Sequence, residues 1–299
     1  MAKTALILGA SGKIGSHAKS AFTQAGWNVR VYDRSADDMR RAARGVDVIV
    51  NGLNPPRYHD WAHLIPAITR QVIAAARVNH ATVIVPGNVY NLDALGGEWS
   101  ENTPHAPPTR KGRIRENMER AYREAGVQTI VLRAGNFIDP KGNGDMMSLV
   151  AFRELAAGKI TSPGDPRAMQ AYCYVPDWAR AAVGLAEIAG TLNAYEDVPF
   201  AGHSFTIEQL SEMVSAELGG RTLRTVNFPW WLFTLTGPFW ELAREMNEMR
   251  YLWSLPHTLS GAKLARLLPE FQATDLRTVI HNALLAQPKV AGHLVTAAV

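Results

Sequence analysis

The chain has 299 residues, of which 47% are hydrophobic and 19% are charged, and this is enough apolar material for one large or two smaller domains. The formal net charge of +4 comes from basic residues mixed with Asp and Glu along helical segments, a pattern that predicts solvated faces and argues against nucleic-acid binding. Cys173 is the only cysteine, which excludes an intrachain disulfide and a thiolate metal cluster, and we predict no metal site.

Neither the N-terminus nor the most apolar stretch of the chain predicts secretion or insertion into a membrane. The N-terminus begins with a strand-like run instead of a charged segment followed by a long apolar one, so a signal peptide is not expected. The most apolar stretch, residues 229–240, is interrupted by Gly237 and Pro238 and is too short to span a bilayer. We therefore expect a cytoplasmic protein with no membrane partner.

Up to residue 135, strand-like and helix-like segments alternate. Short apolar runs predict buried strands at 4–10, 27–33, 46–52, 81–87 and 127–135. Helices are predicted after the first strand and at 35–44, with Ser35 as N-cap, at 64–77 and at 112–126. This alternation predicts an α/β fold with a doubly wound parallel sheet of the Rossmann type.

Beyond residue 140 the pattern loosens. We predict a short helix at 152–158, a strand and helix across 170–187 that return to the main sheet, and a helix at 205–220 that begins with a capping box of Thr206 and Gln209. The predicted Rossmann domain comprises residues 1–140 and 170–195. A smaller, mainly helical C-terminal lobe comprises 141–169 and 196–286, and 287–299 form a poorly ordered tail.

A glycine-rich loop joins the first strand to the first helix. Gly9, Gly12 and Gly15 permit a tight turn, a close backbone approach to a pyrophosphate, and close packing of the helix on the strand. Asp33, at the end of the second strand, can accept hydrogen bonds from both adenosine ribose hydroxyls, which favours NAD. Arg34 would instead suit the 2′-phosphate of NADP, so NADP stays as the alternative cofactor.

Several stretches resemble one branch of a known superfamily. The spacing of the three glycines, together with VDVIVNGLN, VIVPGNVYN, LRAGNFIDP and YVPDWARA, resembles the extended, NAD-dependent epimerase/dehydratase branch of the short-chain dehydrogenase/reductases over residues 4–220. The resemblance implies an NAD(P)-dependent oxidoreductase or epimerase, with sugar nucleotides as the default substrate class. It also implies cofactor contacts from Gly9, Ser11, Gly12, Lys13, Ile14, Gly15, Asp33, Arg34, Gly52, Leu53, Asn54 and Arg115.

The sequence departs from this branch where the family carries its proton chemistry. The family uses a Tyr as general acid/base and a Lys four residues later. Glu119 fixes the register here, and it places Lys111 in the Tyr position and Arg115 in the Lys position. Pro86 takes the place of the family's substrate-binding Ser or Thr, and none of the 8 tyrosines has a Lys four residues later. The Ser or Thr, the Tyr and the Lys that the family uses for proton transfer are therefore not present together.

A second departure concerns length. Only 13 residues separate Asp33 from Asp47, where the family normally fits a helix, a strand and a second helix. We therefore predict that one strand–helix unit is missing, that the sheet is smaller, and that the adenine pocket is more open.

The candidate catalytic residues are Lys111, Tyr90 and Arg115. Lys111 would become a usable acid/base or Schiff-base amine if burial or neighbouring arginines lowered its pKa from about 10.4. Arg115 cannot cycle protons but could hold ribose hydroxyls or an anion. Tyr90 could be a displaced acid. The alternative is a solvated helix start in which these cations pair with glutamates of the same helix.

Further candidates lie near the expected substrate cleft. Arg57 and Tyr58 follow the third strand, and Asn88 and Asn136 follow later strands; we predict that these four bind substrate. The alternative for the asparagines is turn chemistry. The aromatic block at 230–253 is predicted to form the core of the smaller lobe, with an apolar substrate pocket or a homodimer interface as alternatives.

Two functional hypotheses follow. The first is an NAD(P)-dependent oxidoreductase or epimerase/dehydratase-like enzyme with a non-standard active site, acting on a small substrate that could be anionic or a sugar nucleotide. The alternative is a dinucleotide-binding sensor or assembly protein without hydride turnover. The glycine-rich loop supports both hypotheses equally.

Overall fold

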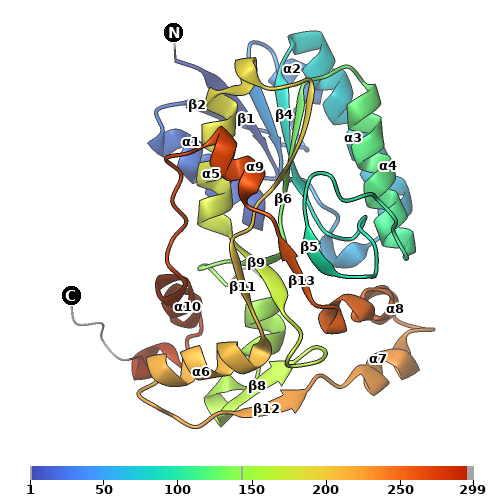
Figure 1. Ribbon diagram of the computed structural model, residues 1–299. Helices are drawn as coiled ribbons and strands as arrows, with labels where there is room; N and C mark the ends of the chain where they lie inside the picture. Colours follow the sequence, from blue (N-terminus) through green and yellow to red (C-terminus); the bar gives the residue numbers. More distant parts are fainter. Residues whose placement is uncertain (1, 143, 295–299) are drawn as a thin grey trace.

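The computed structural model describes residues 2–142 and 144–294. A six-stranded parallel sheet with the order β10-β6-β4-β3-β1-β2 forms its centre (Figure 1). The strands are β1 (Thr4–Leu8), β2 (Asn28–Val31), β3 (Val48–Asn51), β4 (Thr82–Gly87), β6 (Thr129–Arg133) and β10 (Tyr195–Pro199). The five predicted strands up to residue 135 all form, and the doubly wound sheet is confirmed.

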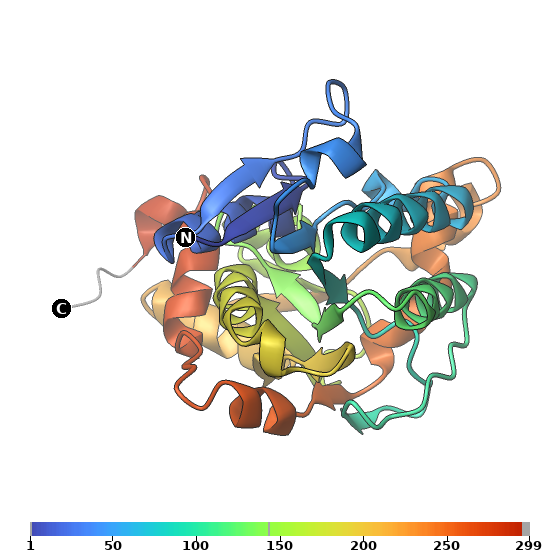
Figure 2. The same ribbon diagram turned by 90° about the horizontal axis from the view of Figure 1, so that it is seen from above.

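Helices cover both faces of this sheet, as the view from above shows (Figure 2). One face carries α1 (Lys13–Gln24) and α5 (Val175–Glu187), and the other carries α2 (Met39–Ala42), α3 (Trp61–Asn79) and α4 (Arg110–Glu124). Successive side chains of a strand point to opposite faces. In β1, Ala5 and Ile7 accordingly pack in the α1/α5 core, whereas Leu6 and Leu8 pack in the α3/α4 core.

The sheet ends at β2. Among the described residues no strand pairs with its outer edge, and α2 alone, with four residues, joins β2 to β3. This agrees with the predicted loss of one strand–helix unit. The helix predicted at 35–44 is wrong in its first half, because Asp33 accepts hydrogen bonds from the backbone and hydroxyl of Ser35 and forms a turn. Asp38 is the actual N-cap.

The strand predicted to return to the main sheet lies elsewhere. β9 (Gln170–Tyr174) is the central strand of a separate sheet, between β7 (Asn136–Ile138) and β11 (His203–Phe205). Its place in the main sheet is taken by β10, which pairs with β6. β9 is buried along its whole length, as a strand of the main sheet would be, so its sequence could not say which sheet it joins. The predicted division at 195/196 cuts through β10.

The smaller lobe combines helices with short strands. Two-stranded sheets pair β8 (Lys159–Ser162) with β12 (Arg224–Asn227), and β5 (Gly97–Trp99) with β13 (His257–Leu259). The helices are α6 (Ile207–Glu217), α7 (Trp230–Thr236), α8 (Glu241–Glu248) and α10 (Leu276–Leu285). The helix α9 (Ala262–Leu267) was predicted to belong to this lobe, but its Leu264 packs in the α1/α5 core of the main sheet. The capping box of Thr206 and Gln209 at α6 is confirmed.

Short helical turns occur along the whole chain. They are η1 (Pro56–Tyr58), η2 (Met147–Ala151), η3 (Leu155–Ala157), η4 (Ala189–Thr191), η5 (Arg250–Ser254) and η6 (Ala291–His293). No helix within the described ranges is long and apolar enough to cross a membrane.

Three predictions for this part of the chain need correction or comment. The helix predicted at 152–158 is instead a turn followed by the 3-10 turn η3, and a π-helical turn, η2, precedes it; an apolar spacing of three to four residues does not separate these forms from an α-helix. The aromatic block at 230–253 is only partly core: Trp230 is buried, but much of α7 is exposed. In the predicted tail, Val290 packs in the lobe core, and residues 295–299 lie outside the described ranges.

Candidate functional site

The glycine-rich loop lies at the carboxyl end of β1, directly before α1. Gly9 has a φ of +70°, and a Cβ on Gly15 would lie 2.2 Å from the carbonyl oxygen of Gly9. Only glycine allows this approach of helix to loop. The N-cap of α1 is Gly12, which has no side chain to bond the amides of the first turn. These amides are therefore available to an anion.

The loop after β3 packs against the glycine-rich loop. A Cβ on Gly9 would lie 2.9 Å from the carbonyl oxygen of Gly52, so the two loops meet at glycines on both sides. Leu53 continues from Gly52, and its amide bonds the side chain of Asn51. The predicted cofactor residues at 9–15 and 52–54 are thus brought together at one edge of the sheet.

The start of α1 also contacts the lobe segment that follows β7. His17 and Asp139 are hydrogen-bonded at 2.9 Å, and both side chains are buried. Burial lowers the pKa of Lys13, although the carboxylates of Asp145 and Asp139 oppose the shift. Lys13 therefore lies at the start of α1, close to two acids of the second lobe.

Asp33 and Arg34 lie exposed at the end of β2. Hydrogen bonds from the side chain and backbone of Ser35 lower the pKa of Asp33, so its carboxylate is charged at neutral pH. An ionised carboxylate at this strand end can accept ribose hydroxyls and would repel a 2′-phosphate.

Lys111 is fully buried at the start of α4, where Thr109 caps the helix. Its ammonium nitrogen lies 2.5 Å from Glu245 Oε2 and 2.7 Å from Glu248 Oε2, and its backbone amide bonds Glu248 Oε1 at 2.8 Å. Both carboxylates come from α8. Burial alone would raise the pKa of Glu248, but the hydrogen bonds and the charge of Lys111 outweigh this effect, and the pKa is lowered. Lys111 is thus not a solvated cation paired within its own helix.

Arg115 lies one turn further along α4. It donates to Asn54 Oδ1 at 2.8 Å, and its guanidinium lies 4.7 Å from the ring centroid of Trp61. The buried Nε of Arg115 has no hydrogen-bond partner among the described residues. A buried N–H of a charged group without a hydrogen-bond partner costs free energy. The bond from Arg115 to Asn54 joins α4 to the loop at 52–54.

Two phenols meet beside these cations. The hydroxyls of Tyr58 and Tyr90 lie 3.1 Å apart, and the ammonium of Lys111 lies 5.2 Å from the ring centroid of Tyr58. Burial raises the pKa of both tyrosines, that of Tyr58 well above 10. Both phenols are therefore protonated at neutral pH, and they can donate a hydrogen bond or a proton.

The segment that carries Tyr58 is strained. Arg57, Tyr58 and Asp60 have φ values of +52°, +62° and +42°. Such left-handed conformations cost non-glycine residues about 1–2 kcal/mol each. Glu241 of α8 holds the segment by a 2.9 Å contact with His59 and by a bond from the amide of Asp60. Strain retained in this way occurs at ligand sites.

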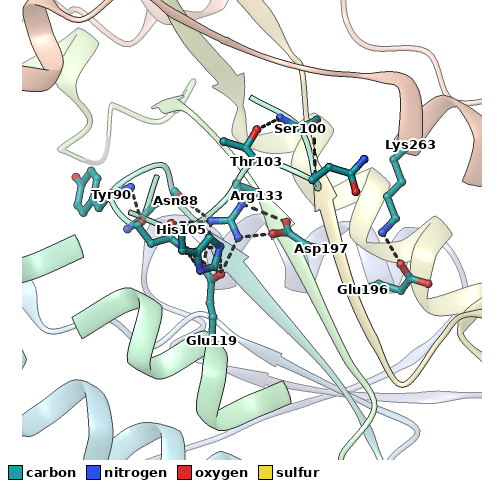
Figure 3. A network of polar contacts seen from close by, with 12 residues as sticks. Asn88, Tyr90, Ser100, Thr103, His105, Glu119, Arg133, Glu196, Asp197 and Lys263 are labelled. Carbon is teal, nitrogen blue, oxygen red and sulfur yellow. Dashed lines mark hydrogen bonds and ion pairs between the residues drawn. The ribbon is translucent and has the colours of Figure 1, made fainter. Parts of the chain in front are cut away.

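Glu119, which set the register, belongs to a buried network of polar contacts around Arg133 (Figure 3). Arg133 donates to Glu119 Oε2 at 2.7 Å and to Asp197 Oδ2 at 2.6 Å. His105, Glu119 and Asp197 have the spacing of metal ligands. Arg133 already neutralises both carboxylates, so we assign no metal to this group.

Of the two predicted substrate asparagines, Asn88 bonds the backbone of one phenol residue, and Asn136 lies in a different sheet. Asn88 Oδ1 accepts from the amide of Tyr90, and the Asn88 carbonyl accepts from Arg133. This is the turn chemistry that the sequence left as an alternative for Asn88. Asn136 lies half-buried in β7, and Arg57 is exposed. Sequence reasoning missed Glu245 and Glu248, because they lie 134 and 137 residues after Lys111 and carry no local signal.

Neither a family model nor a curated protein matches the sequence. Solved structures do match the fold. MoeE5 in complex with UDP-glucose and NAD superposes with a TM-score of 0.74 at 15% identity, over 95% of this chain and 98% of that one. UDP-glucuronic acid 4-epimerase from Bacillus cereus, in complex with UDP-glucuronic acid and NAD, gives 0.72 at 15% identity, over 94% and 97%.

A further match broadens the range of activities that this fold supports. The GalE-like L-threonine dehydrogenase from Cupriavidus necator gives a TM-score of 0.70 at 18% identity, over 98% of this chain and 99% of that one. At these identities the likeness establishes the architecture. The chain has the α/β, Rossmann-type fold of these proteins over almost its whole length, and the predicted fold class is confirmed.

Proposed function

We propose that this protein is an NAD-dependent oxidoreductase or epimerase/dehydratase-like enzyme with a non-standard active site. The observation that carries the proposal is the glycine-rich loop, which has no room for a Cβ at Gly15 and which packs against the loop at Gly52. Sugar nucleotides are the first substrate class to test, because two of the matching structures contain one. The predicted cytoplasmic location belongs to the same proposal.

The residues present fit a dinucleotide. The uncapped start of α1 would hold the pyrophosphate, and Asp33 would accept the adenosine ribose hydroxyls. Arg115 and Asn54, which are hydrogen-bonded to each other, would hold the second ribose. When bound, NAD would supply hydride acceptance and return. The charge of Asp33 supports NAD over NADP, and Arg34 keeps NADP as the alternative.

The proton that accompanies hydride transfer would come from the phenol pair. Tyr58 and Tyr90 are protonated at neutral pH and share a hydrogen bond. Lys111 is less suited to the predicted acid/base role, since losing its proton would leave Glu245 and Glu248 without their buried cation. In this proposal Lys111 positions the ring of Tyr58, and Tyr90 or Tyr58 donates the proton.

A dinucleotide-binding protein without hydride turnover is the second candidate. The observation that favours it is the double ion pair of Lys111, which occupies the position where the resemblance expects a catalytic Tyr. In that case the cofactor loop would work as a sensor or an assembly element, and the phenol pair would be structural.

The deciding experiment is a substrate screen with purified protein and NAD, monitored at the nicotinamide absorbance and, for epimerases, by product analysis. UDP-sugars, UDP-uronic acids and small hydroxy acids form the panel. The proposal expects turnover with at least one of them. NAD binding without turnover across the panel favours the second candidate, and the absence of NAD binding contradicts both.

A further inference from the structure

A groove lies between the segment that follows β2 and one side of α3, and we call it the β2–α3 groove. Its volume is about 510 Å³. Its two walls are lined by Tyr32, Asp37, Asp38, Met39 and Arg40, and by Ala67, Arg70, Gln71 and Ala74. None of the residues predicted to contact the cofactor belongs to this lining. The groove therefore adds a set of side chains that the candidate cofactor site has not yet used.

The groove reaches the carboxyl edge of the sheet beside the glycine-rich loop. The amide of Tyr32 donates to the carbonyl of Ile7 at 3.0 Å, so Tyr32 stands just beyond the end of β2 and alongside the end of β1. Neighbouring strands of a sheet are about 5 Å apart. Asp33 follows Tyr32 directly. The groove therefore begins one residue from the carboxylate that would hold the adenosine ribose.

The order of the strands assigns one half of a dinucleotide to this side. In the sheet, β1 lies between β3 and β2. A pyrophosphate bound at the start of α1 stands over β1, and the two halves of the cofactor extend from it in opposite directions along the edge. Asn54 and Arg115, which would hold the second ribose, lie on the β3 side. The adenosine half therefore lies on the β2 side, where the groove is.

The short connection between β2 and β3 explains why this space is open. The helix α2 has four residues and α3 has 19, so their lengths are about 6 Å and about 28 Å. Met39 of α2 packs in the same core as α3, but α2 is too short to cover the length of α3. Ala67 and Ala74 have small side chains and leave further room. The groove is thus the open adenine pocket that the shortened sequence predicts.

We propose that the β2–α3 groove binds the adenine ring of the dinucleotide, an inference that rests on the proposed function. Adenine has two flat faces and a polar edge that carries an amine donor and nitrogen acceptors. The guanidinium groups of Arg40 and Arg70 can stack on the faces, as arginines do on bases. The amide of Gln71 can donate to a ring nitrogen, and the carboxylate of Asp37 can accept from the amine.

The charges of the groove suit an uncharged base better than a phosphate. Its lining carries two aspartates and two arginines, so its formal charge is zero. A phosphate in the groove would meet Asp37 and Asp38 together, with the ionised Asp33 beside them. The adenine amine, in contrast, needs an acceptor of this kind. This balance agrees with NAD as the cofactor in preference to NADP.

The test is calorimetric titration with NAD, with NADP and with nicotinamide hypoxanthine dinucleotide, in which a carbonyl replaces the adenine amine. R70A/Q71A removes a guanidinium and an amide from exposed positions of α3, and alanine favours a helix, so the fold should be retained. This variant should bind NAD at least about tenfold more weakly than the wild type. Ala67→Trp, which fills the groove, should weaken NAD binding by a similar factor. The wild type should bind the hypoxanthine analogue about tenfold more weakly than NAD.

The matched control is Q24A/R153A, which removes an exposed glutamine from the end of α1 and an exposed arginine from the second lobe. It should bind NAD as the wild type does, and far-UV circular dichroism checks that each variant is folded. The inference is overturned, while the proposed function stands, if either R70A/Q71A or Ala67→Trp binds NAD as tightly as the wild type. A loss confined to NADP in R70A/Q71A would place a phosphate in the groove and would also overturn it. Absence of NAD binding by the wild type overturns the proposed function together with this inference.

Discussion

At the scale of single residues, the buried ammonium of Lys111 separates this protein from the proteins that its sequence resembles. The position that the resemblance assigns to the family's Tyr holds a cation with two carboxylates within 2.7 Å. A buried pair of opposite charges contributes little net stability, but removing one partner leaves an uncompensated charge. Lys111 therefore holds α4, α8 and the ring of Tyr58 together, and its replacement should be measurable as a loss of stability.

We predict that Lys111→Met lowers the free energy of unfolding by about 3–5 kcal/mol. The measurement is urea denaturation, followed by far-UV circular dichroism. Lys159→Met is the matched control, because Lys159 pairs with Glu154 on the surface, where a pair contributes about 0–1 kcal/mol. A stable Lys111→Met variant that loses turnover by about 10²-fold would show instead that Lys111 transfers the proton.

The phenol pair gives the second prediction. Tyr90→Phe and Tyr58→Phe each remove one hydroxyl from a 3.1 Å contact and leave both rings in place. The variant that lacks the proton donor should lose at least about 10²-fold in turnover with NAD affinity unchanged. Tyr251→Phe, which removes a phenol of the neighbouring η5, should keep full turnover. Normal turnover in both pair variants would remove the phenols from the mechanism.

The glycine-rich loop could be predicted from the sequence because its signal is local. Gly9, Gly12 and Gly15 stand between a strand and a helix, and a Cβ on Gly9 or Gly15 would lie within 3 Å of backbone atoms. Asn54 and Arg115 were each predicted as cofactor contacts, but their hydrogen bond to one another was not predicted. Glu245 and Glu248 could not be predicted, since their contact with Lys111 depends on how the second lobe folds back.

At the scale of elements, α8 links the two lobes through the strained segment at 57–60. His59 and Glu241 form the exposed part of this link. The hydrogen bond and charge of Glu241 raise the pKa of His59. A raised histidine pKa contributes stability that is fully present below the unfolded value of about 6.5 and is lost as the pH rises through the folded value. The link should therefore loosen toward alkaline pH.

We predict that the amides of α8 exchange faster at pH 8 than at pH 6, after correction for the intrinsic rate. Glu241→Gln should abolish this difference because it removes the charge that favours the imidazolium. Hydrogen exchange read by mass spectrometry over Glu241–Glu248 measures the effect. The effect is small because both side chains are exposed. An unchanged pH response in Glu241→Gln would assign it to another group.

Elements of the first half of the chain could be predicted because each strand is followed along the chain by a helix that packs on the sheet, although β1 lies between β2 and β3. The strands up to residue 135 alternate with the helices that cover them. The places of the later strands β9 and β10 could not be predicted. β9 has the burial of a main-sheet strand but joins another sheet, and β10, which alternates buried and half-buried residues, closes the main sheet. Tertiary pairing decides between such strands.

At the scale of the whole molecule, the loops at the carboxyl ends of β1 and β3 meet beside the second lobe, and this edge of the sheet is the candidate cofactor site. Loops at these strand ends bind ligands in open α/β sheets. Here the loops after β1, β2 and β3 carry the glycines, Asp33 and Asn54, and α4 contributes Arg115. The central claim is that this edge binds NAD.

Two glycine variants test that claim most directly by calorimetric titration with NAD. A Cβ on Gly12 would meet only the carbonyl oxygen of Gly9, at 3.2 Å, so Gly12→Ala should fold while placing a methyl group where the pyrophosphate approaches. Gly190→Ala is the control, since nothing lies within 4 Å of its Cβ. We predict one NAD per chain for the wild type and Gly190→Ala, and at least about tenfold weaker binding for Gly12→Ala. No binding by the wild type, or equal binding by all three, would contradict NAD binding at this edge.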